Sequence, residues 1–284
     1  MHLKADWVPY LHQLREREFR LIFERYPSKA FRRGLELGAG DGFQSRMLQQ
    51  YVESLVSTDY RRPPLDMDES IDVRALDAEQ LAGAFGPNEF DLVYSSNMLE
   101  HVRDPVAVLR AVHHVLKEDG ISIHVMPNRF WKMCHVVLHV PQLALTALDA
   151  LITTRRPSAI RELLKDWRAG GGPRLGSLHD NNPTLARPAR SLIARALLPE
   201  PHGISPTNRE EFAAFSRRRW REDLGRAGFD LVAVLKGPLS SGYGFGYSSI
   251  RQCLERLGIT SEFVYVAKKK GGACRFEAPF AKSR

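Results

Sequence analysis

Short apolar runs alternate with amphipathic stretches along most of the chain. The runs that predict strands are residues 35–37, 55–58, 71–75, 90–95, 121–126, 229–235 and 263–267. After the fourth run, apolar residues recur at helical spacing over 105–117, and Gly120 is the expected C-terminal signal of that helix. Strands that alternate with helices in this way indicate an α/β fold with a parallel sheet and right-handed crossovers.

Two segments depart from this minimal pattern. Residues 8–26 predict an amphipathic helix, which Pro27 stops before the first strand. Residues 129–206 separate the fifth strand from a helix expected to start near Thr207, where the minimal fold needs only a short connection. Because a long insertion in an α/β enzyme is usually a cap or lid, we expect this one to build the acceptor pocket.

The insertion changes character along its length. Its first half, residues 133–152, is apolar and leucine-rich, and its second half is rich in Gly, Pro and Arg. A membrane-spanning helix is disfavoured because His135, His139 and Pro141 interrupt the apolar stretch. The apolar half of the insertion could form cap helices that pack on the core, or a helix that lies in the membrane interface.

Charge is distributed unevenly along the 284 residues, which are 43% hydrophobic and 26% charged. Residues 1–128 carry a net charge of −5 (15 basic, 20 acidic), 129–219 carry +8 (15 and 7) and 220–284 carry +5 (11 and 6). The basic segments favour an anionic acceptor, a lipid surface or nucleic acid, and a solvated basic surface is the alternative. The start of the chain lacks a secretory pattern and the three cysteines are widely spaced, so we expect a cytoplasmic chain with reduced thiols.

The most informative motif follows the first predicted strand. Residues 36–42, with the sequence E-L-G-A-G-D-G, place three alternating glycines before a helix expected to begin near Phe43. Glycine permits a tight turn with positive φ and lets a ligand approach the backbone closely. Asp59, Asp77 and Ser95 follow or end the next strands, at the edge where open α/β sheets bind ligands.

These motifs together resemble those of the class I S-adenosylmethionine-dependent methyltransferases. They are E-x-G-x-G-x-G at 36–42, D-A-E-x-L at 77–81, F-D-x-V at 90–93 and L-E-H-V at 99–102. A dinucleotide is disfavoured because the third glycine comes one residue before the position that G-x-G-x-x-G requires. The resemblance covers residues 30–128 closely and implies S-adenosyl-L-methionine as the cofactor. It also implies a Rossmann-like, seven-stranded, mostly parallel sheet with helices on both faces, whose last strand is antiparallel.

The chain adds a largely helical cap after the fifth strand of this fold. In the family, a segment such as the first helix often lies across the cofactor mouth. The expected parts are an N-terminal helix or lid (1–30), a cofactor-binding core (31–128), an inserted acceptor-binding cap (129–206), the rest of the core sheet (207–270) and a basic tail (271–284).

The resemblance assigns a role to each residue of the cofactor site. The residues are Glu36, Gly38 and Gly40 for the loop and the methionine part, Asp59 for the ribose hydroxyls, Asp77 and the Ala78 N–H for the adenine, and the Ser95 carbonyl for the ammonium group. Two of these residues have structural alternatives, because Asp59 can cap a turn and Asp77 can be the N-cap of the next helix.

Methyl transfer requires an acceptor held in line with the sulfonium methyl, and a hydroxyl acceptor must also lose its proton. His101 and His202 are the candidate general bases, because unperturbed imidazole titrates near neutral pH. His101 could instead orient a neighbouring helix or the cofactor, and His202 could lie on a loop surface. His135 and His139 stand four residues apart without a third ligand, so we expect no metal.

We therefore expect a methyltransferase that acts on a hydroxyl of a sugar or of a lipid-linked, anionic molecule. The alternatives are C- or N-methylation of a small apolar metabolite resembling a quinone precursor, and a non-catalytic cofactor-binding subunit. Arg155, Arg156, Arg187 and Arg190 are the first candidates to hold an anionic group.

The expected partners are a small-molecule or glycolipid acceptor and an anionic surface at the inner face of the membrane. Nucleic acid is not expected, because residues 95–98 read Ser-Ser-Asn-Met where enzymes that methylate base amines carry Asn or Asp, two prolines and an aromatic. The sequence does not predict the oligomeric state.

Overall fold

A seven-stranded sheet forms the centre of the structure, a computed structural model that describes residues 7–61, 70–154, 197–240 and 248–283. The strands are β1 (Phe31–Leu37), β2 (Val52–Asp59), β3 (Ile71–Ala75), β4 (Phe90–Ser96), β5 (Leu116–Pro127), β6 (Phe229–Lys236) and β7 (Glu262–Lys269). Their order is β3-β2-β1-β4-β5-β7-β6, and only β7 runs antiparallel to its neighbours. This arrangement confirms the expected Rossmann-like fold.

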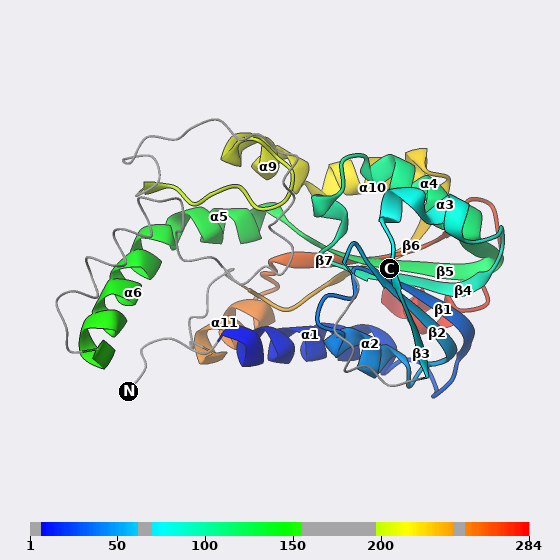
Figure 1. Cartoon of the computed structure of the whole chain (residues 1–284), viewed down its shortest axis with the longest axis horizontal. Helices are drawn as coiled ribbons and strands as arrows, with labels where there is room; N and C mark the ends of the chain where they lie inside the picture. The colour runs from blue at the N-terminus through cyan, green and yellow to red at the C-terminus, as the bar shows by residue number, and fades with distance from the viewer. Residues whose placement is uncertain (1–6, 62–69, 155–196, 241–247, 284) are drawn as a thin grey trace.

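Helices cover both faces of the sheet (Figure 1). One face carries α1 (Trp7–Phe23), α2 (Phe43–Leu48) and α11 (Ser248–Arg256), and the other carries α3 (Leu81–Ala84), α4 (Pro105–Val115) and α10 (Arg217–Arg226). Two short 3₁₀ turns, η1 (Ala78–Gln80) and η2 (Leu99–His101), follow β3 and β4. Each face has its own cluster of buried apolar side chains, so the sheet is buried on both sides.

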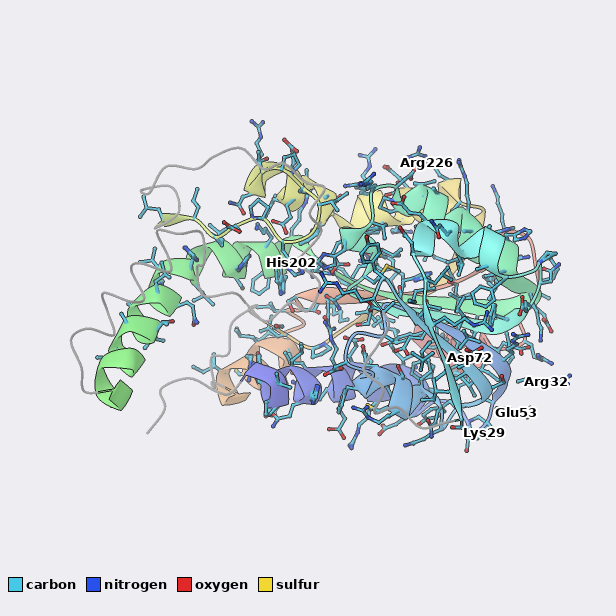
Figure 2. The ribbon with its side chains drawn as sticks, in the orientation of Figure 1. Lys29, Arg32, Glu53, Asp72, His202 and Arg226 are labelled. Atoms are coloured by element: carbon cyan, nitrogen blue, oxygen red, sulfur yellow. The ribbon has the colours of Figure 1, made fainter. Side chains whose placement is uncertain are left out.

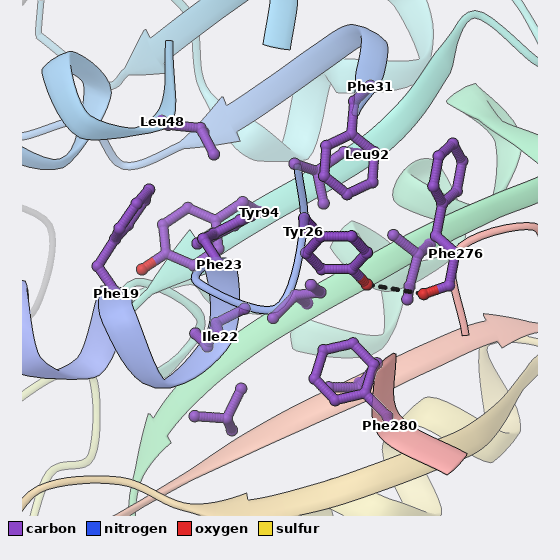
Figure 3. Packing of buried hydrophobic residues seen from close by; sticks show 14 of the residues in the cluster. Phe19, Ile22, Phe23, Tyr26, Phe31, Leu48, Leu92, Tyr94, Phe276 and Phe280 are labelled. Atoms are coloured by element: carbon purple, nitrogen blue, oxygen red, sulfur yellow. Dashed lines mark hydrogen bonds between the residues drawn. The ribbon is translucent and has the colours of Figure 1, made fainter. Parts of the chain in front are cut away.

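The core beneath α1 joins the two ends of the described chain. Phe23 of α1 packs edge-on against Tyr94 of β4, and the Tyr26 hydroxyl donates to the Phe276 carbonyl at 2.7 Å (Figure 3). Phe276 and Phe280 are buried, so this part of the expected basic tail packs against the core. Burial of the two phenylalanine rings stabilises that packing.

The end of α4 also differs from the expectation. The helix stops at Val115, and Gly120 lies inside β5 instead of closing the helix. Leu116 already pairs with Phe90 of β4, and the register between the two strands then shifts before Ile121. A Cβ at Gly120 would stand 2.9 Å from a Leu116 methyl carbon and 3.1 Å from the Asp91 carbonyl oxygen, so a larger residue would force its neighbours in this irregular stretch of sheet to shift.

The insertion begins with two helices that lead away from β5 (Figure 1). They are α5 (Arg129–Val137) and α6 (His139–Thr154), and the chain returns to the sheet through α9 (Asn208–Ala214). Thr207 is the N-cap of α9, as expected. Arg155, Arg156, Arg187 and Arg190 lie outside the described residues. Within the described ranges, no helix combines the length and apolar character needed to cross a bilayer.

Candidate cofactor-binding and catalytic site

The glycine motif forms a tight loop between β1 and α2. Gly38, Gly40 and Gly42 have φ values of +80°, +59° and +76°, a region that residues with a Cβ rarely adopt. A Cβ at Gly38 would stand 2.7 Å from the Met98 side chain, so the loop also lies close to the segment after β4. Gly38 and Gly40 remain partly exposed, which leaves their backbone accessible to a ligand.

Glu36 lies beneath this loop and is buried. Its carboxylate accepts hydrogen bonds from the Ser45 hydroxyl of α2 and, at 2.8 Å, from the Ser57 hydroxyl of β2. Burial raises its pKa to about 7, against the opposing effect of these two hydroxyls. Glu36 therefore ties the first turn of α2 to the sheet, which supports the loop from below; contact with a ligand stays a prediction.

The two acidic residues of the next strands lie at the same edge. Asp59 accepts from the Gly40 N–H at 2.9 Å and from the Arg61 N–H at 3.2 Å, so it both anchors the glycine loop and caps a turn. Asp77 is partly exposed and accepts from the Glu79 N–H as the N-cap of η1. A carboxylate has about four lone-pair sites, so these contacts are compatible with roles in ligand binding.

Ser95 ends β4 in a buried polar chain. Its hydroxyl is hydrogen bonded to His124 Nδ1 at 2.7 Å, and the Ser122 hydroxyl is bonded to His124 Nε2 at 2.6 Å. Burial lowers the pKa of His124 to about 3, so its imidazole is neutral at physiological pH. The side chain of Ser95 is thus fixed within the sheet, which leaves only its backbone for the role expected at the cofactor.

Helix α1 closes one side of the loop, with contacts that the sequence analysis did not predict. The His12 ring stacks on Phe43 with centroids 4.0 Å apart, and His12 Nε2 lies 2.6 Å from Asp41 Oδ2. Arg15 donates to the Ser96 hydroxyl at 3.0 Å at the end of β4. The only sequence signal was the amphipathic pattern, which identifies the buried face of the helix but not its polar contacts.

The two candidate catalytic histidines lie together although a hundred residues separate them. The ring centroids of His101, at the end of η2, and His202, before α9, are 4.7 Å apart. His202 lies where the sheet meets the inserted helices, whereas Lys29, Arg32, Glu53 and Asp72 mark the opposite end of the strands (Figure 2). The sequence analysis named both histidines but could not predict that they are neighbours.

Aromatic residues surround this pair on the side of the insertion. The Trp131 ring of α5 lies 5.1 Å from the His202 ring and 5.9 Å from Phe215, between centroids. Behind it, Lys132 and Glu211 form a buried ion pair between α5 and α9. Glu211 also accepts the His202 N–H at 2.7 Å, so the ion pair fixes the segment that carries His202.

The site as a whole fits S-adenosylmethionine. The left-handed glycine loop gives access to its own backbone, and a carboxylate follows each of the next two strands. A ligand with an amino-acid part, a ribose and an adenine would present polar groups to these positions in turn. We infer that the carboxyl edge of β1, β2, β3 and β4 holds the cofactor and that the histidine pair faces the acceptor.

Comparison with known proteins identifies a methyltransferase domain in the chain. Residues 35–124 match the family model of the methyltransferase domain. This part of the chain is thus similar to a methyltransferase domain, which supports S-adenosylmethionine as the cofactor.

Curated relatives match less than half of the chain. A ubiquinone biosynthesis O-methyltransferase of Pseudomonas aeruginosa (strain LESB58) is 33% identical over 125 residues, which cover 41% of this chain and 53% of that protein. The protein of the same name from Stutzerimonas stutzeri (strain A1501) is 32% identical over 124 residues, with 37% and 53% covered. The chain thus spans about half the length of the curated relatives it matches.

Solved structures extend the likeness in fold to most of the chain. An S-adenosylmethionine-dependent methyltransferase from Listeria monocytogenes has a TM-score of 0.51 at 13% identity, covering 93% of this chain and all of that one. The [4+2]-cyclase SpnF has a TM-score of 0.50 at 14% identity, covering 96% and 88%. Since the second protein is named for a cyclisation, this fold alone does not define the reaction.

Proposed function

We propose that the chain is an enzyme that transfers the methyl group of S-adenosylmethionine to a hydroxyl of a small, amphiphilic acceptor. The observation that carries the proposal is the position of His101 and His202. They lie side by side just beyond β4, while the glycine loop and Asp59 occupy the neighbouring strand ends. This arrangement supports a role for the two imidazoles as proton acceptors beside the cofactor, which supplies an electrophilic methyl carbon.

The chain's own residues have three tasks in this reaction. The loop and Asp59 bind and orient the cofactor, and α1 closes over the loop through His12. His101 and His202 hold the acceptor hydroxyl and help to remove its proton. Glu100 Oε1 lies 4.0 Å from His101 Nε2, where its charge would stabilise positive charge on the ring. The acceptor oxygen then forms a bond to the methyl carbon as the carbon–sulfur bond breaks.

Two features support an amphiphilic acceptor. Trp131 lies beside His202 and offers an aromatic wall to an apolar or aromatic body. Helices α5 and α6 also present apolar side chains to solvent, which suits an acceptor drawn from a lipid surface. These side chains are Met133, Val137, Val140, Leu148 and Ile152. The curated relatives are named for O-methylation in ubiquinone biosynthesis, so phenolic quinone precursors are the first acceptors to test.

The test compares turnover with cofactor binding in the same variants. Transfer of a labelled methyl group to phenolic and lipid-linked hydroxyl acceptors is measured by mass spectrometry for the wild type, His101→Gln and His202→Gln. We expect kcat to fall on the order of 10²-fold or more, the range for loss of a positioned proton acceptor, with S-adenosylhomocysteine affinity unchanged. The control His114→Gln changes an exposed histidine on α4.

Trp131→Ala tests the acceptor wall separately. We expect it to raise KM for the acceptor more than it lowers kcat, because the ring packs on the acceptor side of the site. A product methylated on carbon or nitrogen would overturn the proposal that the acceptor is a hydroxyl group. Cofactor binding without transfer to any acceptor tested would favour a non-catalytic subunit.

A further inference from the structure

A carboxylate joins the two histidines to make a compact three-residue group. Glu100, His101 and His202 each offer one ligand atom, and these atoms all lie within 4.8 Å of one another. We propose that this group is a binding site for one divalent transition-metal ion. The role of the ion in the reaction rests on the proposed function. The binding of an ion at this site does not.

The backbone holds the ligands from two distant segments in a fixed relation. The Ile204 N–H donates to the Glu100 carbonyl at 3.3 Å. Gly203 has a φ of +71°, and a Cβ there would stand 2.5 Å from the same carbonyl oxygen. Only glycine allows this approach, so the residue after His202 is fitted against the backbone of Glu100. The site is therefore built into the fold and does not result from two mobile loops that happen to meet.

Burial gives the group its electrostatic character. The Glu100 side chain is 1% exposed and that of His101 is 16% exposed. A carboxylate removed from water is strongly stabilised by a cation in direct contact. Two neutral imidazoles beside it can supply nitrogen lone pairs, and a metal ion would supply the positive charge. A protonated histidine beside Glu100 is the competing arrangement, and it requires no metal.

The donor set selects the kind of ion. Two imidazoles and one carboxylate are the ligands of catalytic zinc sites and of non-haem iron sites, and both leave a coordination position open. Magnesium and calcium prefer oxygen ligands, so they are disfavoured here. Tetrahedral ligands at about 2.1 Å from a metal stand roughly 3.4 Å apart, so the side chains must close by about an ångström on binding.

The position of the site gives the ion a task. Glu100 and His101 lie in η2, shortly after β4, and Met98 at the start of this turn lies against the Gly38 Cβ position in the cofactor loop. An acceptor hydroxyl bound at the open position would have a lowered pKa, as water has on zinc. With the metal bound, the two imidazoles act as its ligands and not as proton acceptors, so the hydroxyl proton would leave to solvent as the oxygen forms the new bond to the methyl carbon. The carbon–sulfur bond breaks, and its electron pair stays on sulfur.

Cobalt binding tests the site without any measurement of activity. The full chain is treated with a chelator, dialysed and titrated with CoCl₂ while its visible ligand-field absorption is recorded. We expect one Co²⁺ per chain with the spectrum of a site of low coordination number. His101→Gln and His202→Gln should each weaken binding on the order of 100-fold, and His114→Gln should not change it. Zn²⁺ should displace Co²⁺, and Mg²⁺ should not.

Two measurements on the wild type test the site even if the variants fail to fold. X-ray absorption on the wild-type cobalt complex should show two imidazole ligands, and Co²⁺ should raise the wild-type Tm. Absence of a ligand-field spectrum, or unchanged Co²⁺ affinity in both histidine variants, would overturn the metal site. If metal-free protein still binds S-adenosylhomocysteine and methylates hydroxyls at the full rate, the proposed function stands without the metal. If Co²⁺ binds but no acceptor is methylated, the metal site stands and the proposed methyl transfer fails.

Discussion

The Gly40 N–H donates to Asp59 Oδ2 at 2.9 Å, so the glycine loop after β1 is fixed by the carboxylate that ends β2. Gly40 has a φ of +59°, and this bond helps to hold it there. The same carboxylate is the residue expected to take the ribose hydroxyls. One side chain thus fixes the shape of the loop and is also the one that we propose to bind the ribose.

Replacement of Asp59 should therefore have two separable effects. We expect Asp59→Ala to weaken S-adenosylhomocysteine by about 1 to 3 kcal/mol, the range for losing hydrogen bonds to a charged group. Asp59→Asn keeps an oxygen for the Gly40 N–H, so it should retain more of the affinity and more of the Tm. Calorimetry and thermal melts measure both effects, with exposed Asp72→Ala as the control. Equal affinity in all three variants would remove Asp59 from the cofactor site.

Substitution of Gly40 tests the loop itself. Gly40→Ala forces a side chain into the left-handed region, which costs about 1 to 2 kcal/mol. Gly40→Val should abolish S-adenosylhomocysteine binding in a chain that remains folded by circular dichroism. Gly225→Ala is the matched control, because Gly225 lies in α10 with no atom near its Cβ position. That variant should keep full affinity and gain up to about 1 kcal/mol of stability.

The buried His124 predicts a loss of stability in mild acid. Its pKa is about 3 in the fold, below the ordinary value of 6.5 that applies in the unfolded chain. Below pH 6.5, His124 therefore binds a proton in the unfolded state but stays neutral in the folded state. The free energy of unfolding should fall by up to about 1.4 kcal/mol per pH unit from this group as the pH drops from 6.5 towards 3.

Urea unfolding of the wild type and His124→Gln between pH 7.5 and 5 measures this contribution. The advantage of the wild type should shrink steadily as the pH falls, because glutamine takes up no proton. Exposed His114→Gln should show no such trend relative to the wild type. A constant difference between the wild type and His124→Gln would contradict the neutral, buried imidazole.

Glu36 should change the free energy of unfolding with pH in the direction opposite to His124. Its pKa is raised to about 7 by burial, so the folded state binds a proton that the unfolded state has already lost above pH 4.5. The stability that this proton gives is full below pH 4.5 and is lost as the pH rises through 7. Glu36→Gln should therefore gain on the wild type between pH 5 and 8 in urea unfolding. If the stability of Glu36→Gln relative to the wild type stays constant or falls over this range, the raised pKa of Glu36 is contradicted.

Much of the sheet could be predicted from sequence because its strands are buried on both faces and appear as unbroken apolar runs. The sequence also locates the glycine loop, since three alternating glycines before a helix have few other uses. The end of α4 was missed because Leu116 continues the apolar stripe of that helix and is a good helix former. Leu116 pairs with Phe90 of β4 and therefore belongs to β5, and this contact is not local in sequence.

The arrangement of the site depends on contacts that no local pattern encodes. Glu100 appeared within a family motif, but its place beside His202 depends on how the chain returns from the insertion. The same holds for His12, whose contact with Asp41 requires α1 to lie against the loop. Helix α11 was not predicted, because its nine residues are mostly polar.

The packing of Tyr26 against Phe276 and Phe280 has a consequence for synthesis on the ribosome. The core under α1 contains residues from both the first thirty and the last ten positions of the chain. Those apolar side chains near the start of the chain must wait until residue 280 has left the exit tunnel before their shared cluster can close. Until then the growing chain carries exposed phenylalanines, the kind of surface that chaperones shield. This half of the fold therefore closes late, once residues near both 20 and 280 are available to pack together.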